Sequence, residues 1–321
     1  MLCLGLINNN THAIEVFASS RAYLYIIIFF FFGYSRFNIN LNKLFYIAVG
    51  SILGGYFNGV LLSPTLENIH SYSNIITYAI LVSYPLIKKR YFLFIICLFG
   101  ALYISFYSGL RRQIVEVFLS FAFTYFLILL RDNVKINKLF ILIFIILPFL
   151  VTKFIFYIED YFLKNNIYLW RRIFLKTQHL EDSIASEGSR IEHPYNLINY
   201  ISDTIIPKGI YPRGVSFNVA NSVGSTLDFP LYEIFYVFGS LTAIVFILFF
   251  IKGIFRCVKL IFIGNKNEDE IIMICSISIL LIFACFFDGS FLQYTFVTPF
   301  TGFVLGRLFF FKKKVFNASS S

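Results

Sequence analysis

Residues 91–130 decide the class of fold. They read YFLFIICLFGALYISFY from 91 to 107, SGLRRQ from 108 to 113 and IVEVFLSFAFTYFLILL from 114 to 130. Two apolar runs therefore flank a short polar connection, and each has the length of roughly 17 to 25 residues that a helix needs to cross a bilayer. Because the runs are continuous rather than alternating, they indicate helices and not the strands of a barrel.

The composition of the whole chain agrees with a membrane protein. Of its 321 residues, 58% are apolar or aromatic and 14% are charged, whereas soluble domains carry about a quarter charged residues. This composition excludes a disordered chain, a collagen-like chain and a small disulfide scaffold. The five cysteines are scattered without metal-ligand spacing and the four histidines lie far apart, so we expect neither a metal nor a cofactor.

We predict an all-α polytopic membrane protein with about nine transmembrane helices. The candidate spans are 22–32 (beginning nearer Ile14), 44–62, 69–87, 91–107, 114–130, 139–158, 229–251, 271–287 and 291–311. The chain then divides into an N-terminal bundle (1–158), a large polar segment (159–228) and a C-terminal bundle (229–321).

The basic residues set the expected orientation. The net charge of +10 comes from short clusters between apolar runs, which favours a membrane over nucleic acid as partner. Alternate connections carry Arg36 and Lys43, Lys88 to Arg90, Arg131 to Lys138, Lys252 to Lys266, and Lys312 to Lys314. Since basic connections stay in the cytoplasm, we expect the N-terminus and residues 159–228 to lie outside.

Arg111 and Arg112 depart from this pattern, because they lie on the expected outer side at the start of a span. Glu116 follows Arg112 by four residues and shares its helix face. Two readings stay open. One is a structural ion pair with a snorkelling arginine, and the other is a guanidinium fork aimed at an anionic ligand.

The outer segment offers further candidate groups. Residues 160–180 predict an amphipathic helix, either an interfacial brace or the wall of a lateral opening for an anionic lipid-linked substrate. The turn-rich remainder carries Arg190, His193, Arg213 and Asp228, which are able to bind anions or move protons. Asp228 stands where the segment meets the next apolar run, although each loop charge alone is also explained by simple solvation.

With this layout, the chain resembles the O-antigen polymerases, the Wzy-type oligosaccharide repeat-unit polymerases related to the O-antigen ligases. Three patches carry the resemblance: 108–112 (Ser-Gly-Leu-Arg-Arg), 187–190 (Glu-Gly-Ser-Arg) followed by 207–210 (Pro-Lys-Gly-Ile), and 228–233 (Asp-Phe-Pro-Leu-Tyr-Glu) ending at Phe238-Gly239. Family members often carry a His- or Asn-containing pair near the last patch, where this chain has Asp228.

The resemblance implies a GT-C-like, metal-independent glycosyltransferase of the bacterial inner membrane. It would join oligosaccharide units held on undecaprenyl pyrophosphate into O-antigen or capsule-type polysaccharide at the periplasmic face. The resemblance also brings a chain-length regulator into consideration as a partner, beside membrane lipids.

Residue roles follow from that reaction. Arg111, Arg190 and Arg213 would stabilise the departing pyrophosphate, with Arg112 a weaker candidate because Glu116 is near it. Asp228, or else His193, would accept the proton of the attacking sugar hydroxyl.

Three rival functions stay open. A lipid-linked oligosaccharide flippase or exporter would need access to both faces, whereas the charged residues here concentrate on one face. An O-antigen ligase differs only in the acceptor, and a structural membrane subunit would have no site at all.

Overall fold

The computed structural model describes residues 3–4, 13–35, 40–62, 75–108, 111–132, 161, 164, 201–210, 217–219, 222–224, 230–263, 268–285, 292 and 297–318. Within these residues the fold is a helical bundle with one small antiparallel hairpin, formed by β1 (Phe217–Val219) and β2 (Ser222–Gly224). The prediction of helices rather than a strand-built barrel is confirmed for this part of the chain.

Eight helices of 13 residues or more make up the described bundle. They are α2 (Ala13–Tyr34), α3 (Leu41–Leu62), α4 (Ile75–Ile87), α5 (Tyr91–Ser108), α6 (Arg111–Arg131), α14 (Ser240–Ile263), α15 (Glu268–Ala284) and α17 (Thr298–Ala318). A ninth, short helix is α13 (Pro230–Phe238). The predicted span 139–158 and nearly all of the predicted amphipathic helix 160–180 lie outside the described residues.

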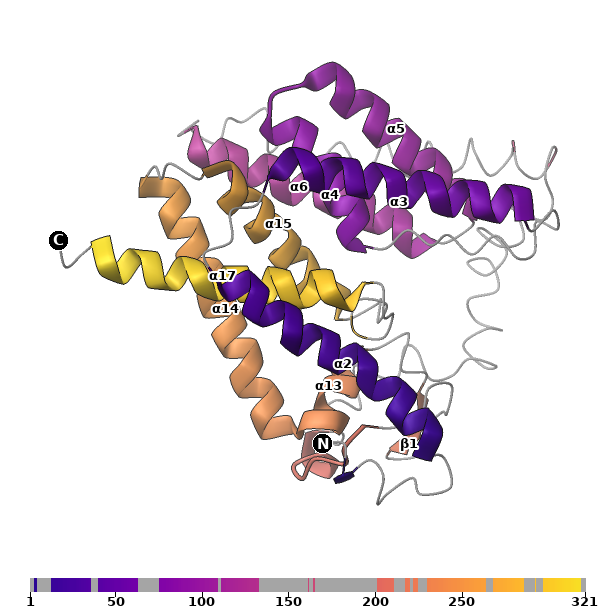
Figure 1. The fold of residues 1–321 in the computed structure, drawn as a ribbon, viewed down its shortest axis with the longest axis vertical. Coiled ribbons are helices and arrows are strands. Elements are labelled where there is room, and N and C mark those ends of the chain that lie inside the picture. The colour runs from indigo at the N-terminus through magenta and orange to yellow at the C-terminus, as the bar shows by residue number, and fades with distance from the viewer. Residues whose placement is uncertain are drawn as a thin grey trace.

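From α2 to α6, and again from α14 to α17, successive long helices alternate in direction (Figure 1). At one end, α4 and α6 finish and α15 begins, and five charged residues make ion pairs there: Lys88, Lys89, Arg131, Asp132 and Asp269. We call this the charged end. At the opposite end, which we call the loop end, α6 and α14 begin, and residues 201–210 are hydrogen-bonded to the start of α14.

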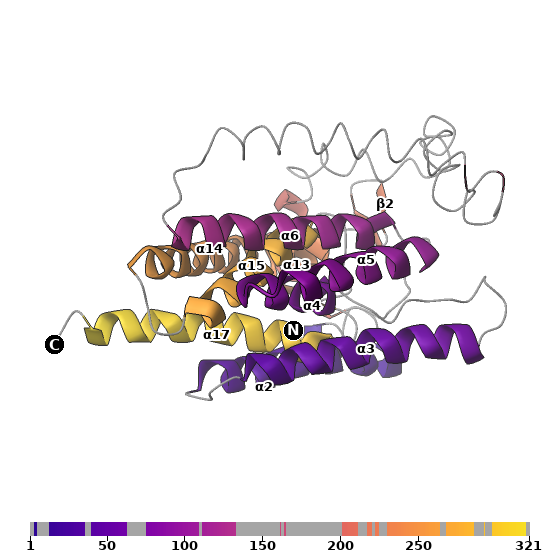
Figure 2. The ribbon, with the colours of Figure 1, turned by 90° about the horizontal axis from the view of Figure 1, so that it is seen from above.

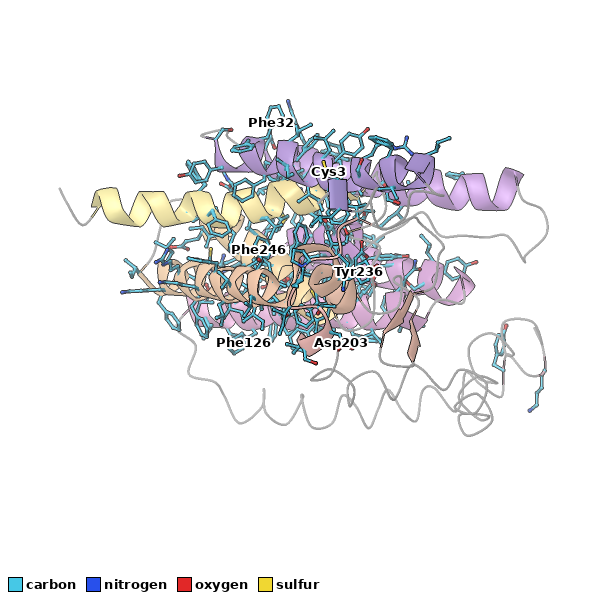
Figure 3. All side chains as sticks on the ribbon, turned by 90° about the horizontal axis from the view of Figure 1, so that it is seen from below. Cys3, Phe32, Phe126, Asp203, Tyr236 and Phe246 are labelled. Atoms are coloured by element: carbon cyan, nitrogen blue, oxygen red, sulfur yellow. The ribbon has the colours of Figure 1, made fainter. Side chains whose placement is uncertain are left out.

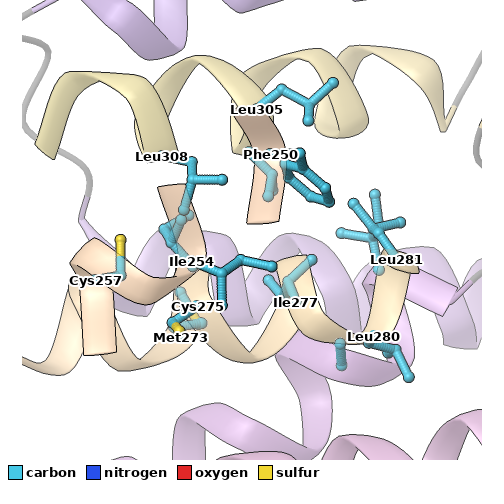
Figure 4. Packing of buried hydrophobic residues seen from close by; sticks show 14 of the residues in the cluster. Phe250, Ile254, Cys257, Met273, Cys275, Ile277, Leu280, Leu281, Leu305 and Leu308 are labelled. Atoms are coloured by element: carbon cyan, nitrogen blue, oxygen red, sulfur yellow. The ribbon is translucent and has the colours of Figure 1, made fainter. Parts of the chain in front are cut away.

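The core lies where α4, α6, α14, α15 and α17 meet. Ile254 and Cys257 of α14, Ile277 of α15, and Leu305 and Leu308 of α17 are buried against one another (Figure 4). Figure 2 shows α2 and α3 on one face of the bundle and α6 on the opposite face, with α4 and α15 between them. The two apolar parts of the chain therefore share one core.

The first and last long helices touch backbone to backbone. A methyl group built on Gly302 of α17 would collide with the carbonyl oxygen of Ile26, and one on Gly306 would collide with that of Phe30. Gly33 of α2 lies equally close to the carbonyl oxygen of Phe303. This four-residue spacing of glycines allows close approach of helices in a bilayer, and the order of the contacts makes α2 and α17 parallel.

The predicted span 229–251 is wrong in its boundaries. Gly239 has φ +79° and separates α13 from α14, so the long helix runs from Ser240 to Ile263. Glycine takes this left-handed conformation at helix ends without steric cost. Its Cα also lies against residues 201–210, since a Cβ there would be 3.0 Å from the carbonyl oxygen of Ile205. Lys252, Arg256 and Lys259 consequently belong to α14 and not to a connection.

Among the residues that the structure describes, two helical segments are long and apolar enough to cross a membrane, Gln113–Arg131 and Ser240–Ile263. Shorter apolar helical segments are Ser19–Tyr34, Leu41–Gly54, Ile75–Ile87, Tyr91–Ser105 and Thr298–Phe311. Large apolar side chains also face outward on several helices, such as Phe32 of α2 and Phe126 of α6 (Figure 3).

Candidate functional site at the loop end

The structure describes the backbone of two of the six predicted site residues. Arg111 and Arg112 are the first two residues of α6, at the loop end. Their side chains lie outside what the structure describes, as do Arg190, His193, Arg213 and Asp228 entirely. The gathering of these groups around one ligand therefore stays a prediction.

Polar side chains are buried in the first turns of α6, just after Arg111 and Arg112 in the sequence. The helix begins at Arg111, so Arg112 and Glu116 are one turn apart on a single helical backbone, as the sequence predicts. Glu116 is 1% exposed and Gln113 is 3% exposed. The Tyr78 hydroxyl of α4 donates to Oε1 of Gln113 over 3.3 Å. Polar groups thus enter the interior of the bundle at this end.

A second buried carboxylate lies on α13. Glu233 is 3% exposed, and its carboxylate accepts a hydrogen bond from the hydroxyl of Tyr23 on α2. The Tyr23 ring also packs edge-on against Phe238, with ring centroids 5.7 Å apart. We expected no role for Glu233 from the sequence, although a single carboxylate in the apolar run after the polar segment indicates a functional position.

Backbone hydrogen bonds fix α13 in this position. The backbone N–H of Lys208 donates to the carbonyl oxygen of Tyr236 over 2.9 Å. The N–H of Ser240 donates to the carbonyl oxygen of Thr204 over 2.7 Å, and the N–H of Leu231 donates to that of Cys285 over 3.2 Å. Both ends of α13 are therefore held by neighbouring segments, which orients Glu233 toward α2.

Two buried hydroxyls near α13 have no hydrogen-bond partner. They belong to Ser19 of α2, which is 7% exposed, and to Ser240 at the start of α14, which is 1% exposed. Ser19 precedes Tyr23 by four residues, so both lie on the same face of α2. Buried polar atoms in proteins are nearly always paired, so these two enclosed hydroxyls are unusual.

Polar groups are also buried nearer the middle and the charged end. Ser83, Thr124 and Ser276 join α4, α6 and α15 through hydroxyl contacts of 2.6 and 2.7 Å. Arg307 of α17 forms a buried ion pair with Glu270 of α15. No group of three or more metal-ligating side chains occurs among the residues that the structure describes.

Comparisons with known proteins add no relative: no family model matches the chain, and neither the curated proteins nor the solved structures contain a match.

Proposed function

We propose that the chain is a multi-pass glycosyltransferase of the bacterial inner membrane. It would polymerise oligosaccharide repeat units carried on undecaprenyl pyrophosphate, with its site on the periplasmic side at the loop end. The observation that carries the proposal is the polar start of α6, where Gln113 and Glu116 are buried beneath Arg111 and Arg112. Intramembrane polar groups at a bundle end are typical of a ligand site.

The orientation rests on the charged end. Lys88, Lys89 and Arg131 lie there, and Arg90 directly follows Lys89. Basic residues at helix ends favour the cytoplasmic side of a membrane. The loop end would then face the periplasm. Because α6 and α14 both begin at the loop end, the chain between them has to return, and the apolar run 139–158 is long enough to do so. Nine spans follow.

The chemistry needs fixed positive charge more than a metal. When the pyrophosphate departs, negative charge develops on its bridging oxygen, and donors held in a water-poor site stabilise that charge. Arg111, Arg190 and Arg213 would bind the pyrophosphate, and Arg112 would take part while pairing with Glu116. Asp228 or His193 would accept the proton of the attacking hydroxyl.

A second function has its own supporting observation. The buried Arg307–Glu270 pair and the hydroxyl contacts among Ser83, Thr124 and Ser276 extend polar groups toward the charged end. Ionisable groups inside a bundle also mark translocation paths, so a lipid-linked oligosaccharide flippase or exporter is the alternative. An O-antigen ligase would use the same donor and a different acceptor.

Glycan analysis in a deletion strain separates these functions. Complementation with Arg111→Ala or Asp228→Ala should leave single repeat units on the surface if the chain is a polymerase. Loss of one anion-binding donor is expected to lower the rate about 100- to 1,000-fold. Lys252→Ala, on the exposed surface of α14, is the control and should restore long chains.

Other outcomes contradict the polymerase proposal. Complete absence of surface sugar in the deletion strain indicates the flippase. Long chains that accumulate on the lipid carrier without transfer indicate the ligase, and normal ladders in both variants remove the site assignment.

A further inference from the structure

We propose that Tyr23 and Glu233 form the proton-accepting pair of this site. The Tyr23 hydroxyl would take the proton of the incoming sugar hydroxyl while it passes its own proton to the Glu233 carboxylate. This inference rests on the proposed polymerase function and names a proton acceptor in place of Asp228 and His193.

The contact itself has the geometry of a proton relay. The Tyr23 hydroxyl already donates a hydrogen bond to a carboxylate oxygen of Glu233, so that oxygen is placed to accept the proton of the Tyr23 hydroxyl. The two residues are 210 positions apart and belong to different helices, α2 and α13. Their meeting is therefore a property of the tertiary structure.

Tyr23 and Glu233 differ in exposure, and this difference indicates a different role for each in the proton transfer. Glu233 is 3% exposed and Tyr23 is only partly buried, so Tyr23 is the one that a substrate would touch. The unpartnered Ser19 hydroxyl lies on the same face of α2, one turn nearer the loop end.

A purely structural hydrogen bond explains these observations less well. A tyrosine hydroxyl needs only a neutral acceptor, such as a glutamine or a backbone carbonyl, to tie α2 to α13. Burying a carboxylate costs more free energy than burying a neutral amide. Unlike a neutral amide, a carboxylate is able to take the proton of the Tyr23 hydroxyl.

The transfer step is balanced. The oxygen of the acceptor hydroxyl forms a bond with the anomeric carbon of the donor sugar, and the bond from that carbon to the pyrophosphate oxygen breaks. The lipid pyrophosphate leaves with the electron pair. The hydroxyl proton moves to the Tyr23 oxygen, and the Tyr23 proton moves to Glu233, so no oxidant or further reactant is needed.

Other titratable groups lie on the elements packed around α13. Among the described residues they include Arg21 and Tyr25 on α2, Asp203 and Lys208 in the segment 201–210, Tyr236 on α13 itself, Lys252 and Arg256 on α14, and Cys285 after α15. The Tyr23 hydroxyl contacts the carboxylate of Glu233 directly.

The test measures chain extension in membrane vesicles. The probe is lipid-linked repeat units extracted from a strain that lacks this protein. Glu233→Gln keeps an acceptor for Tyr23 but cannot take a proton, so extension should fall about 100-fold or more. Tyr23→Phe should also be slow. As the pH is lowered, this variant should lose activity at a higher pH than the wild type does, because removing the hydrogen-bond donor disfavours the charged form of the Glu233 carboxylate.

Matched controls are Tyr25→Phe on the exposed side of α2 and Glu268→Gln at the charged end, both expected to match the wild type. Glu233→Gln within threefold of the wild type overturns the inference. If that variant does not accumulate in membranes, the pH profile of Tyr23→Phe decides, and an unshifted profile overturns the inference. Wild-type vesicles that make no chains from the probe overturn the proposed function as well.

Discussion

Arg307 of α17 and Glu270 of α15 form an ion pair inside the bundle, with 2% and 10% of the two side chains exposed. The guanidinium also donates from Nη1 to the carbonyl oxygen of Ser35 at the end of α2, over 3.1 Å. Its carbon lies 4.5 Å from the ring centroid of Phe310. A single arginine thus joins α17 to α15 and to the distant end of α2, close to the charged end.

Removing one partner of this pair should destabilise the protein strongly. Arg307→Ala leaves Glu270 as a buried charge without its partner, and we expect a loss of about 3 to 5 kcal/mol in the free energy of unfolding. Unfolding of the purified protein in detergent measures this. The double variant Arg307→Met with Glu270→Leu should lose less than Arg307→Ala, and the exposed Lys259→Ala should lose little. Equal losses in the single and double variants would contradict the pairing.

The glycines of α17 should tolerate no side chain. A methyl group at Gly306 overlaps the carbonyl oxygen of Phe30, so Gly306→Ala should lower the free energy of unfolding by about 1 to 3 kcal/mol. Gly50→Ala on α3 is the matched control, because its Cβ would have nothing within 4 Å. Alanine there should be neutral or slightly stabilising. The comparison fails if the two variants have the same effect in the unfolding measurement.

Asp132 should make stability depend on pH in the acid range. Its hydrogen bond with Arg131, followed by the charges of Arg131 and Lys89, lowers the pKa of Asp132 below its ordinary value of 3.8. A carboxyl whose pKa falls on folding stabilises the protein above its unfolded pKa, and this contribution is lost as the pH falls through the folded pKa. The melting temperature of Asp132→Asn should therefore be lower than that of the wild type at pH 7, and the difference should shrink below pH of about 4. A difference that is constant with pH would speak against this ion pair.

The proposed orientation predicts which residues reagents reach from outside. In a background with Cys3→Ser, we expect Ser202→Cys at the loop end to react with a membrane-impermeant maleimide in intact spheroplasts. Ser35→Cys, after α2 at the other end, should react only after permeabilisation. Mass shifts of the labelled protein report both. The reverse pattern would place the loop end in the cytoplasm and remove the proposed function.

Helix positions are largely readable from the sequence. The predicted spans 44–62, 91–107 and 114–130 correspond to α3, α5 and α6, which differ from them by three residues or fewer at each end. A continuous apolar run is a local signal, and the polar connections beside it mark where the run ends. The break at Gly239 has no such signal, because the run on either side stays apolar while the left-handed turn is imposed by packing against residues 201–210.

The sequence by itself determined that this chain is built from apolar helices, where most of them lie, and which connections carry positive charge. The tertiary structure alone decided that Glu233 meets Tyr23, that Arg307 meets Glu270, and that α2 lies against α17. The reason is physical: hydropathy and charge are properties of neighbouring residues, whereas a buried carboxylate finds its partner only after distant helices have packed together.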